Sequence, residues 1–446
     1  MLDNNLIRKI VLMVATVVPA FAVAQSKTDT AGAIPLTINQ VWEKAAVNNK
    51  VIQMQQLALQ GRQELVKDAK TERLPEITAQ GMYARVSNMP LYSHGIFNAP
   101  EQYPVLHNYY TFGGEAYFNI YNGKKTDLKI NEEKTEQQIA EQQKNLATSN
   151  IKLQAAASYL DLQRGLMFKT LLTRDIADQE KQLEQILQLQ KHGVVLKSDI
   201  LRAQLQLSRL RLSLDQINND IAIATQKLNI IIGQPDSVNV NPVDRLTADS
   251  IVLRPYDDYL NFAVNHAFQY KISEKETELK ALQLKDVKAN VSPKVGLFAN
   301  YAYTYPQIQF FPYSADFYGL GMYGVKASFS ISSFYYNKHK EKAAELDYKR
   351  QEVEHSNTAD QVRQQVNEAY LRFQQALRQV NVARTNVTQA TENARIVNNT
   401  YFNQLSLVTD LLDANTQLLQ TRFDLAAAQI SAQMQYYQLQ NAIGNL

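Results

Sequence analysis

The spacing of apolar positions along the chain changes in a regular order. From Thr37 to Arg73 the pattern is helical, with Thr37 available to cap the helix and Leu74-Pro75 to stop it. After Pro75 apolar and polar residues alternate, which predicts a strand over about 76–87. A second alternating stretch predicts a strand over about 109–121. The Pro- and Asn-rich residues between the two predict a loop.

Two long helices are then expected. The stretch from Lys124 to about Gln190 contains no Pro and a single Gly, which predicts a helix of about 100 Å at ~1.5 Å per residue. His192-Gly193 interrupts it, and Ser198 or Asp199 is placed to cap the next helix, which ends at Gly233. Apolar residues of that helix recur in alternating steps of three and four, the spacing of a coiled-coil seam.

The same order of elements then returns, so the chain is an internal repeat. Asp410 corresponds to Asp199 and Gly444 to Gly233, and both pairs have the same separation along the chain, here called the repeat offset. The second copy predicts helices over 257–290 and 337–403, strands over about 294–305 and 319–333, and a last helix ending at Gly444. We therefore divide the chain into a first repeat, residues 25–240, and a second, residues 241–446.

The N-terminus has the pattern of a signal peptide. Basic Arg8 and Lys9 precede an apolar stretch too short to span a bilayer, and Ala22-Val23-Ala24 fits a cleavage site. We expect residues 1–24 to be removed and the mature chain to be exported. A buried N-terminal helix is the alternative.

Composition narrows the function classes. The net charge of +3 over 446 residues does not suggest a nucleic-acid-binding surface. There is no cysteine, and the six histidines are scattered, so we expect neither a metal site nor a cofactor. No nucleophile or phosphate-loop signature is present, so the sequence predicts no enzyme.

Each pair of strands has one apolar, aromatic-rich face and one polar face. Amphipathic hairpins packed on helices would show the same pattern. Three observations favour a membrane barrel: the predicted export, the polar residues Glu115 and Lys326 that suit a wet lumen, and aromatic residues near the strand ends. Those aromatic residues are Tyr109, Tyr110, Tyr121, Tyr301, Tyr303, Phe334, Tyr335 and Tyr336.

Four strands cannot close a barrel, and open edges are not tolerated in lipid. Strands that span a membrane must therefore close by oligomerisation, and eight, twelve or sixteen strands all remain open. The alternative is a periplasmic coiled-coil scaffold or adaptor, which would leave the Pro-bounded strand pairs unexplained.

The complete arrangement resembles the TolC-like outer-membrane efflux proteins. The resemblance covers nearly all of the mature chain, and its most specific local match is Val408-Thr-Asp410-Leu-Leu-Asp413-Ala with Tyr401 upstream. It implies a mixed α and β membrane protein, with a helical barrel in the periplasm and a homotrimer that shares one transmembrane β-barrel. It also implies a passive duct in the cell outer membrane, in contact with its lipid, that works with a periplasmic adaptor and an inner-membrane transporter of the RND or ABC type.

The resemblance also implies roles for particular residues. Asp410 and Asp413 fall where the family can place aspartate rings at the periplasmic entrance. Asp199, Ser198 and Tyr401 fall where it can hold the entrance closed. Ser406 replaces the basic residue that the family often carries there. From the residues alone, Asp199 and Asp410 are explained equally well by capping at a helix N-terminus.

Overall fold

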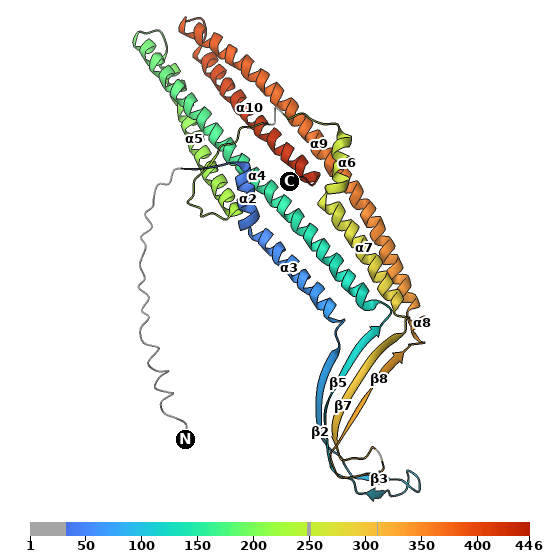
Figure 1. Cartoon of the computed structure of the whole chain (residues 1–446). Coiled ribbons are helices and arrows are strands. Elements are labelled where there is room, and N and C mark those ends of the chain that lie inside the picture. Colours follow the sequence, from blue (N-terminus) through green and yellow to red (C-terminus); the bar gives the residue numbers. More distant parts are fainter. Residues whose placement is uncertain (1–32, 248–250, 310) are drawn as a thin grey trace, which may run out of the picture.

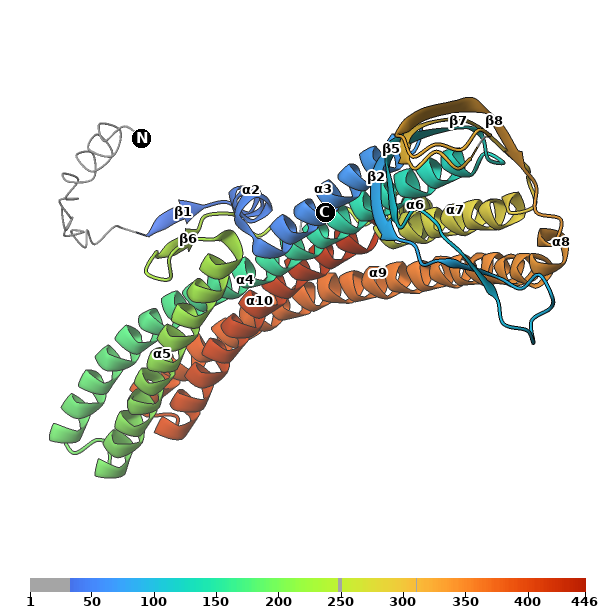
Figure 2. The same ribbon diagram turned by 90° about the horizontal axis from the view of Figure 1, so that it is seen from below.

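The computed structural model describes residues 33–247, 251–309 and 311–446 of the chain. The molecule is elongated, with long helices at one end and a curved sheet at the other (Figure 1, Figure 2). The expected signal peptide, residues 1–24, lies outside the described residues. None of the described helices combines the length and the apolar character that crossing a membrane would require.

The elements of the first repeat are β1 (Ile34–Leu36), α2 (Ile38–Asn48), α3 (Lys50–Thr71), β2 (Glu76–Arg85), β3 (Met89–Leu91), β4 (Glu101–Tyr103), β5 (Asn108–Tyr121), α4 (Lys125–Lys191) and α5 (Lys197–Ile232). Those that follow are β6 (Val240–Pro242), α6 (Tyr256–His266), α7 (Phe268–Ala289), β7 (Lys294–Tyr305), β8 (Tyr318–Ser328), α8 (Ser333–Tyr336), α9 (Lys338–Phe402) and α10 (Val408–Ala442).

Each repeat consists of one long helix beside a column of shorter ones. Helix α4 packs against α3 and α5, and α9 packs against α7 and α10, while the contacts of α4 with α7 and with α10 join the repeats (Figure 1). The largest buried cluster lies at mid-height, where Tyr159 and Leu162 of α4 meet Leu228 of α5 and Val41 of α2. Helices α3 and α5 therefore form one outer edge of the helical layer, and α9 forms the other.

The continuous helix expected over Thr37–Arg73 is wrong, because the chain breaks at Asn49. The Asn49 backbone is extended there, and its side chain accepts a hydrogen bond from Val51 N–H at 2.9 Å, which starts α3. Asn48 and Asn49 also donate side-chain hydrogen bonds to the carbonyls of Ile232 and Ile231, at 3.1 and 3.2 Å. Two adjacent asparagines thus satisfy the end of α5 while they interrupt their own helix.

The helix expected over 257–290 is also broken, at Ala267, which lies as far before Pro293 as Asn49 lies before Pro75. No asparagine is present there. The backbone of Gly444, at φ +77°, approaches so closely that a Cβ would lie 2.4 Å from the carbonyl oxygen of His266. Packing of the C-terminus against this break, rather than a local capping side chain, accompanies the second interruption.

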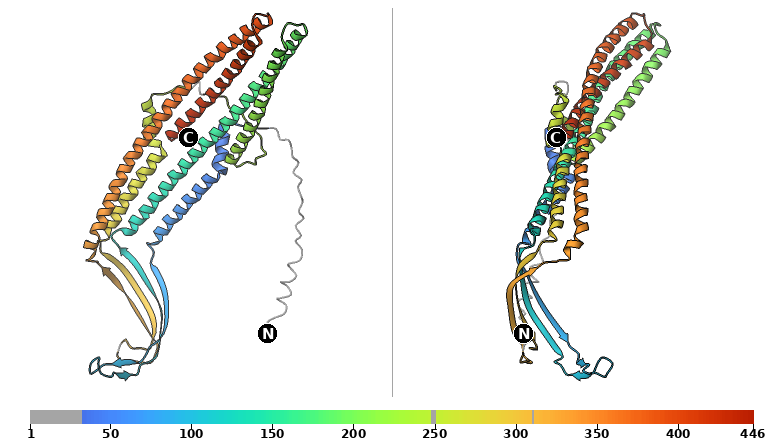
Figure 3. Two further views of the ribbon diagram at one scale, coloured as in Figure 1. Left: turned by 180° about the vertical axis from the view of Figure 1, so that it is seen from behind. Right: turned by 90° about the vertical axis from the view of Figure 1, so that its right-hand side faces the viewer.

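The four long strands form one antiparallel sheet in the order β2-β5-β7-β8. Strands β5 and β7 pair from Tyr110 with Tyr305 to Tyr121 with Val295, so the sheet joins the two repeats at its centre. Within the described residues, the outer edges of β2 and β8 have no strand partner. A short β3–β4 hairpin projects from the far end of the sheet (Figure 3).

The register confirms that the two faces of the sheet differ in chemistry. Cross-strand partners point to the same side. One face collects mainly apolar and aromatic residues: Ile77, Tyr83, Tyr110, Phe112, Phe118, Leu297, Tyr301, Tyr303, Tyr323 and Val325. The opposite face includes Glu76, Thr78, Gln80, Thr111, Glu115, Asn119, Asn300, Thr304 and Lys326.

The strand predicted over about 319–333 is too long, because β8 ends at Ser328. The next residues turn and form the short helix α8. Ser333 Oγ donates to the carbonyl of Ser330 at 2.5 Å, and the Ser330 and Ser332 hydroxyls lie 3.2 Å apart. Serine side chains that bond to nearby backbone compete with a strand ladder, which explains the early end.

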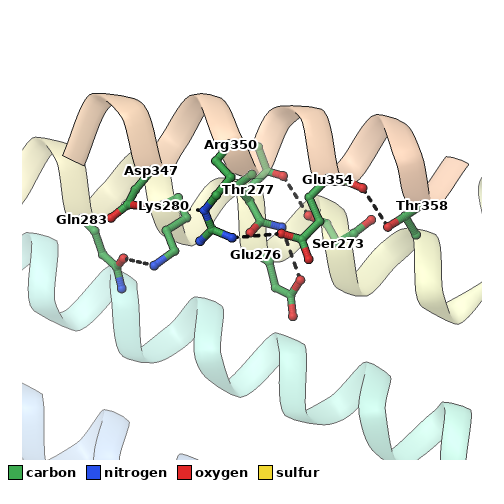
Figure 4. Close-up of polar contacts among 10 residues, drawn as sticks. Ser273, Glu276, Thr277, Lys280, Gln283, Asp347, Arg350, Glu354 and Thr358 are labelled. Atoms are coloured by element: carbon green, nitrogen blue, oxygen red, sulfur yellow. Dashed lines mark hydrogen bonds and ion pairs between the residues drawn. The ribbon is translucent and has the colours of Figure 1, made fainter. Parts of the chain in front are cut away.

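Polar contacts connect the helices just above the sheet. The amide of Gln351 in α9 donates to Glu276 Oε2 of α7 at 3.4 Å. Figure 4 shows Arg350 and Glu354 on the same stretch of α9, where Arg350 Nη1 reaches Glu354 Oε2 at 3.4 Å. Burial raises the pKa of Glu276, and the neighbouring Glu354 carboxylate raises it further. The interface between α7 and α9 thus brings two carboxylates close to each other.

Candidate functional site at the helix tips

The two helix hairpins end side by side, far from the sheet (Figure 1). A buried apolar cluster joins them: Ile186, Ile200 and Ala203 of the first repeat contact Tyr401, Val408 and Leu411 of the second. The tips are therefore packed against each other within one chain.

Both turns are built in the same way. Val194 N–H donates to the carbonyl of Leu189 at 3.0 Å, and Leu405 N–H donates to that of Thr400 at 2.8 Å. Each turn needs one residue in the left-handed region. The first repeat supplies Gly193 at φ 75°, and the second supplies Gln404 at φ 61°. A side chain in this conformation is strained, so the second turn is the less favourable of the two.

The two aspartates at the equivalent position accept the same backbone hydrogen bond. Asp199 Oδ2 accepts from Leu196 N–H at 3.2 Å, and Asp410 Oδ2 accepts from Leu407 N–H at 3.1 Å. Both carboxylates therefore lie in the first helical turn, and Leu196, rather than Ser198 or Asp199, occupies the cap position of α5. They bond back to the residue that precedes each helix, which satisfies one free donor. Stabilisation of the helix start, which the sequence offered as the alternative to a gating role, is thus observed for both Asp199 and Asp410.

Of the three residues expected to close the entrance, Tyr401 is the buried one. It is only 5% exposed, and its hydroxyl has no hydrogen-bond partner among the described residues. Burial raises the pKa of Tyr401, and the Asp199 carboxylate raises it further. Tyr401, Ser198 and Asp199 line one hollow of about 440 Å³. The structure brings these three residues together without a hydrogen bond between Tyr401 and Asp199.

Ser406 lines the same hollow and is engaged within its own turn. Its hydroxyl lies 3.2 Å from that of Thr400. The cation in this region comes from the other repeat, because Arg202 also lines the hollow. Arg202 is the counterpart of Asp413 at the repeat offset. Among the described residues, neither Arg202 nor Asp413 takes part in an ion pair, and both are exposed, as is Asp410.

A polar contact between the hairpins was not predicted. Gln182 of α4 is 9% exposed; its amide donates to Asn398 Oδ1 at 3.3 Å and accepts from Asn415 Nδ2 at 3.0 Å. These three residues connect α4, α9 and α10 near the tips. Their sequence signal is a glutamine within a buried helical stripe, which pattern alone does not distinguish from a surface position.

The two polar residues expected in a lumen, Glu115 of β5 and Lys326 of β8, point to the same face of the sheet and are both exposed. They occupy equivalent positions in the two repeats, but they do not face each other. Glu115 pairs with Asn300, whereas Lys326 pairs with Gly296. Thr78 donates to Glu115 Oε1 at 3.2 Å. In the described part of the chain, no group of three or more His, Cys, Asp or Glu side chains could hold a metal ion.

No protein-family model and no curated protein matches this sequence. Solved structures do match it over almost its whole length. VceC, an outer-membrane protein of Vibrio cholerae, is 18% identical, with a TM-score of 0.74 over 91% of this chain and 96% of that one. CusC, studied for its folding and transmembrane channel formation, is 14% identical, with a TM-score of 0.77 over 92% of each chain.

A third structure is the open state of MtrE, an outer-membrane channel of Neisseria gonorrhoeae. It is 15% identical, with a TM-score of 0.72 over 91% of this chain and 88% of that one. At these identities the likeness establishes the arrangement of the elements in space, which is the arrangement expected from the repeat. The chain has the TolC-like fold of the outer-membrane channels.

Proposed function

We propose that the protein is an outer-membrane exit duct, a passive trimeric channel from the periplasm to the exterior. In this role it serves an efflux or secretion system, driven by an inner-membrane transporter of the RND or ABC type through a periplasmic adaptor. The observation that carries the proposal is the four-stranded sheet with one apolar face and two open edges, set on a TolC-like helical body.

The sheet supports the membrane location. Side chains on its apolar face are strongly exposed in the single chain, among them Tyr323 at 89% and Ile77 at 77%. A face of this kind is stable against lipid and unfavourable against water. In lipid the edges of β2 and β8 must find partners, because an unpaired backbone group there costs several kcal/mol. The β8 edge of one copy and the β2 edge of the next satisfy each other, which places Glu115 and Lys326 in the lumen.

The helical layer supports closure by copies of the same chain. Along its two outer edges, the described helices carry apolar side chains that are exposed in the single chain. On α3 and α5 these include Met54, Leu57, Leu201, Leu205 and Leu212, and on α9 they include Leu346, Val353, Leu371, Val382 and Ile396. Joining one edge to the other gives a ring, and three copies give twelve strands, as the resemblance to the family implies.

The remaining expectations belong to the same proposal. Residues 1–24 act as the export signal, and the boundary between the first and second repeats, at residues 240 and 241, lies within β6, which pairs in parallel with β1. The paired helix tips form the periplasmic entrance, with Asp410 and Asp413 as acidic rings and with Tyr401, Ser198 and Asp199 in its closure. The protein itself catalyses no reaction.

The test is single-channel conductance in planar bilayers combined with a mass measurement in detergent. We expect a trimer that conducts. A water-soluble monomer without conductance would instead support a periplasmic scaffold or adaptor.

Two neighbouring residues of β8 provide a matched pair for this test. Tyr323→Lys places a charge on the apolar face, whereas Met322→Lys places it on the polar face. A lysine facing lipid near the middle of the bilayer costs about 2–4 kcal/mol. We therefore expect Tyr323→Lys to lose trimer assembly and conductance while Met322→Lys keeps both. Equal behaviour of the two variants would argue against a lipid-facing apolar surface.

A further inference from the structure

The connection between the sheet and the long helix differs between the two repeats. In the first, β5 runs to Tyr121 and α4 begins at Lys125. In the second, β8 stops earlier, and residues 329–340, here named the junction segment, contain α8 and the start of α9. At the repeat offset, Phe334, Tyr335 and Tyr336 replace Gly123, Lys124 and Lys125. The fold can make this connection without the three aromatic residues, so their presence needs another explanation.

The aromatic residues of the junction segment are exposed. Phe334, Tyr335 and Tyr336 have exposed fractions of 58%, 62% and 67%, and Phe329 and Ile331 beside them are exposed as well. The rings of Tyr335 and Tyr336 lie 4.5 Å apart. The segment directly follows a strand of the apolar-faced sheet. Tyrosine and phenylalanine at this level are typical of the boundary between lipid tails and headgroups.

Cations follow the aromatic residues at once. Lys338, His339 and Lys340 are exposed in the first turn of α9, and neither lysine forms an ion pair within the described residues. The acid of this turn, Glu341, lies 3.8 Å from Lys288 of α7. Positive charge at a helix N-terminus opposes the helix dipole, so the helix itself does not favour these residues. An anion outside the protein would compensate them.

Hydrogen bonds at Asn337, here called the base, anchor the junction segment to α7 and to the turn that follows it. Asn337, between the aromatic and the cationic residues, is buried; its amide donates to the Val287 carbonyl at 2.7 Å and accepts from Asn290 Nδ2 at 3.0 Å. Lys125 of α4 donates to Asn290 Oδ1 at 2.5 Å. Beside this base lies a hollow of about 500 Å³, lined by Phe334, Lys338, His339, Lys342, Asn337, Val291, Glu341 and Glu345. Glu345 is already paired with Lys342 and Lys349, at 3.0 and 2.7 Å.

We propose that the junction segment binds anionic phospholipids of the periplasm-facing leaflet. Its aromatic rings lie at the headgroup level, and Lys338 and Lys340 contact lipid phosphates. The proposal rests on the proposed function, because it requires the sheet to span the outer membrane. It assigns the segment a lipid partner rather than a second copy of the chain, since the exposed aromatic residues directly follow the apolar-faced sheet and precede two lysines that form no ion pair within the described residues.

The test uses the Tyr335→Trp variant of the full-length trimer in phosphatidylcholine vesicles. A minority of the lipid is brominated, either phosphatidylglycerol or phosphatidylcholine, and quenching of the new tryptophan is measured after subtraction of the Trp42 signal from the parent protein. We expect brominated phosphatidylglycerol to quench more strongly at equal content. With Lys338→Gln and Lys340→Gln added, we expect this preference to weaken by roughly twenty- to thirtyfold, since each lysine near an anionic surface contributes about 1 kcal/mol.

The control is Lys349→Gln with Arg350→Gln, which removes the same charge from the same helix at residues outside this hollow that are already paired with Glu345 and Glu354. It should keep the preference. Equal quenching by the two brominated lipids, or equal loss in both double variants, would overturn the proposal. Absence of quenching in trimers that still conduct would show that a second copy covers the segment, which overturns the proposal and leaves the duct intact. Loss of conductance in the parent protein would instead contradict the proposed function.

Discussion

The two repeats agree at one end of the molecule and differ at the other. At the tips they share the same turn hydrogen bonds and the same aspartate contact, made by Asp199 and Asp410. At the sheet, one repeat passes into its long helix through Gly123 and Lys124, and the other through the aromatic helix α8. The two copies therefore share the backbone of the tips, while the connection from sheet to long helix differs in both backbone and side chains. Positions where the copies differ are therefore the most informative targets for mutation.

The largest expected difference concerns a pair of equivalent tyrosines. The Tyr159 hydroxyl is buried, lies 2.9 Å from the Leu36 carbonyl and 2.8 Å from Asp244 Oδ2, and accepts from Asp244 N–H at 3.2 Å. Tyr159→Phe should lower the free energy of unfolding by about 1–3 kcal/mol, because it removes the hydrogen bonds of a buried hydroxyl and leaves the Asp244 N–H without this acceptor. Thermal melting followed by circular dichroism measures this cost.

Tyr370 is the matched control in the second repeat. Its ring packs against Tyr256 and Tyr259, and its hydroxyl has no hydrogen bond within the described residues. Tyr370→Phe should change stability by less than about 0.5 kcal/mol. Similar losses in the two variants would show that the hydroxyl of Tyr159 has no special role.

The next difference is that Asp175 of the first repeat can carry a charge, whereas its counterpart in the second repeat cannot. Burial raises the pKa of Asp175 to about 6, against the opposing effect of Arg422. The equivalent residue in the second repeat is Asn386. Because the folded state holds the proton more tightly than the unfolded state, the native protein loses stability as pH rises from about 4 to 6. Asp175→Asn should therefore stabilise the protein above pH 6, by about 1–2 kcal/mol after allowing for screening, and the gain should vanish near pH 4.

Thermal melting over this pH range tests the effect. Asn386→Asp, at an exposed position, should give no comparable dependence on pH. A gain from Asp175→Asn that is the same at every pH would contradict the role of proton binding.

A smaller effect is expected at the turn residues. Gln404 has a left-handed backbone where the first repeat has Gly193. Gln404→Gly should stabilise the second hairpin by about 0.5–1 kcal/mol, and Gly193→Gln should destabilise the first by about 1 kcal/mol. Hydrogen exchange at the tips measures both changes. The prediction fails if the two substitutions act in the same direction.

The smallest change in stability is expected for Asp410 and Asp413, the acidic residues of the proposed entrance. Asparagine can still accept the Leu407 hydrogen bond, so Asp410→Asn with Asp413→Asn removes charge and keeps the helix start. This variant should weaken cation selectivity and block by multivalent cations, both measured in single channels. Asp199→Asn should have less effect, since Arg202 rather than a second acid follows it. Unchanged selectivity would remove Asp410 and Asp413 from the constriction.

Much of the fold could be predicted from the sequence, because periodicity is a local signal and the constant repeat offset states it twice. The strands, the two-faced sheet and the long helices follow from the periodicity and from the repeat offset. The breaks at Asn49 and Ala267 could not be predicted, since they lie where the end of another helix packs. The candidate site was predicted only in part. Asp199 and Tyr401 lie together, but the contact of Gln182 with Asn398 and Asn415 depends on two hairpins meeting in space.

The pairing of β5 with β7 has a consequence for folding. Tyr110 pairs with Tyr305, although nearly half of the chain lies between them. The sheet therefore cannot be completed until a large part of the second repeat has been made. Contacts between such distant residues form slowly, and strand edges left open in the meantime promote aggregation. If the chain is exported as proposed, it crosses one compartment before its sheet is complete, and the β2–β5 hairpin needs protection during that time.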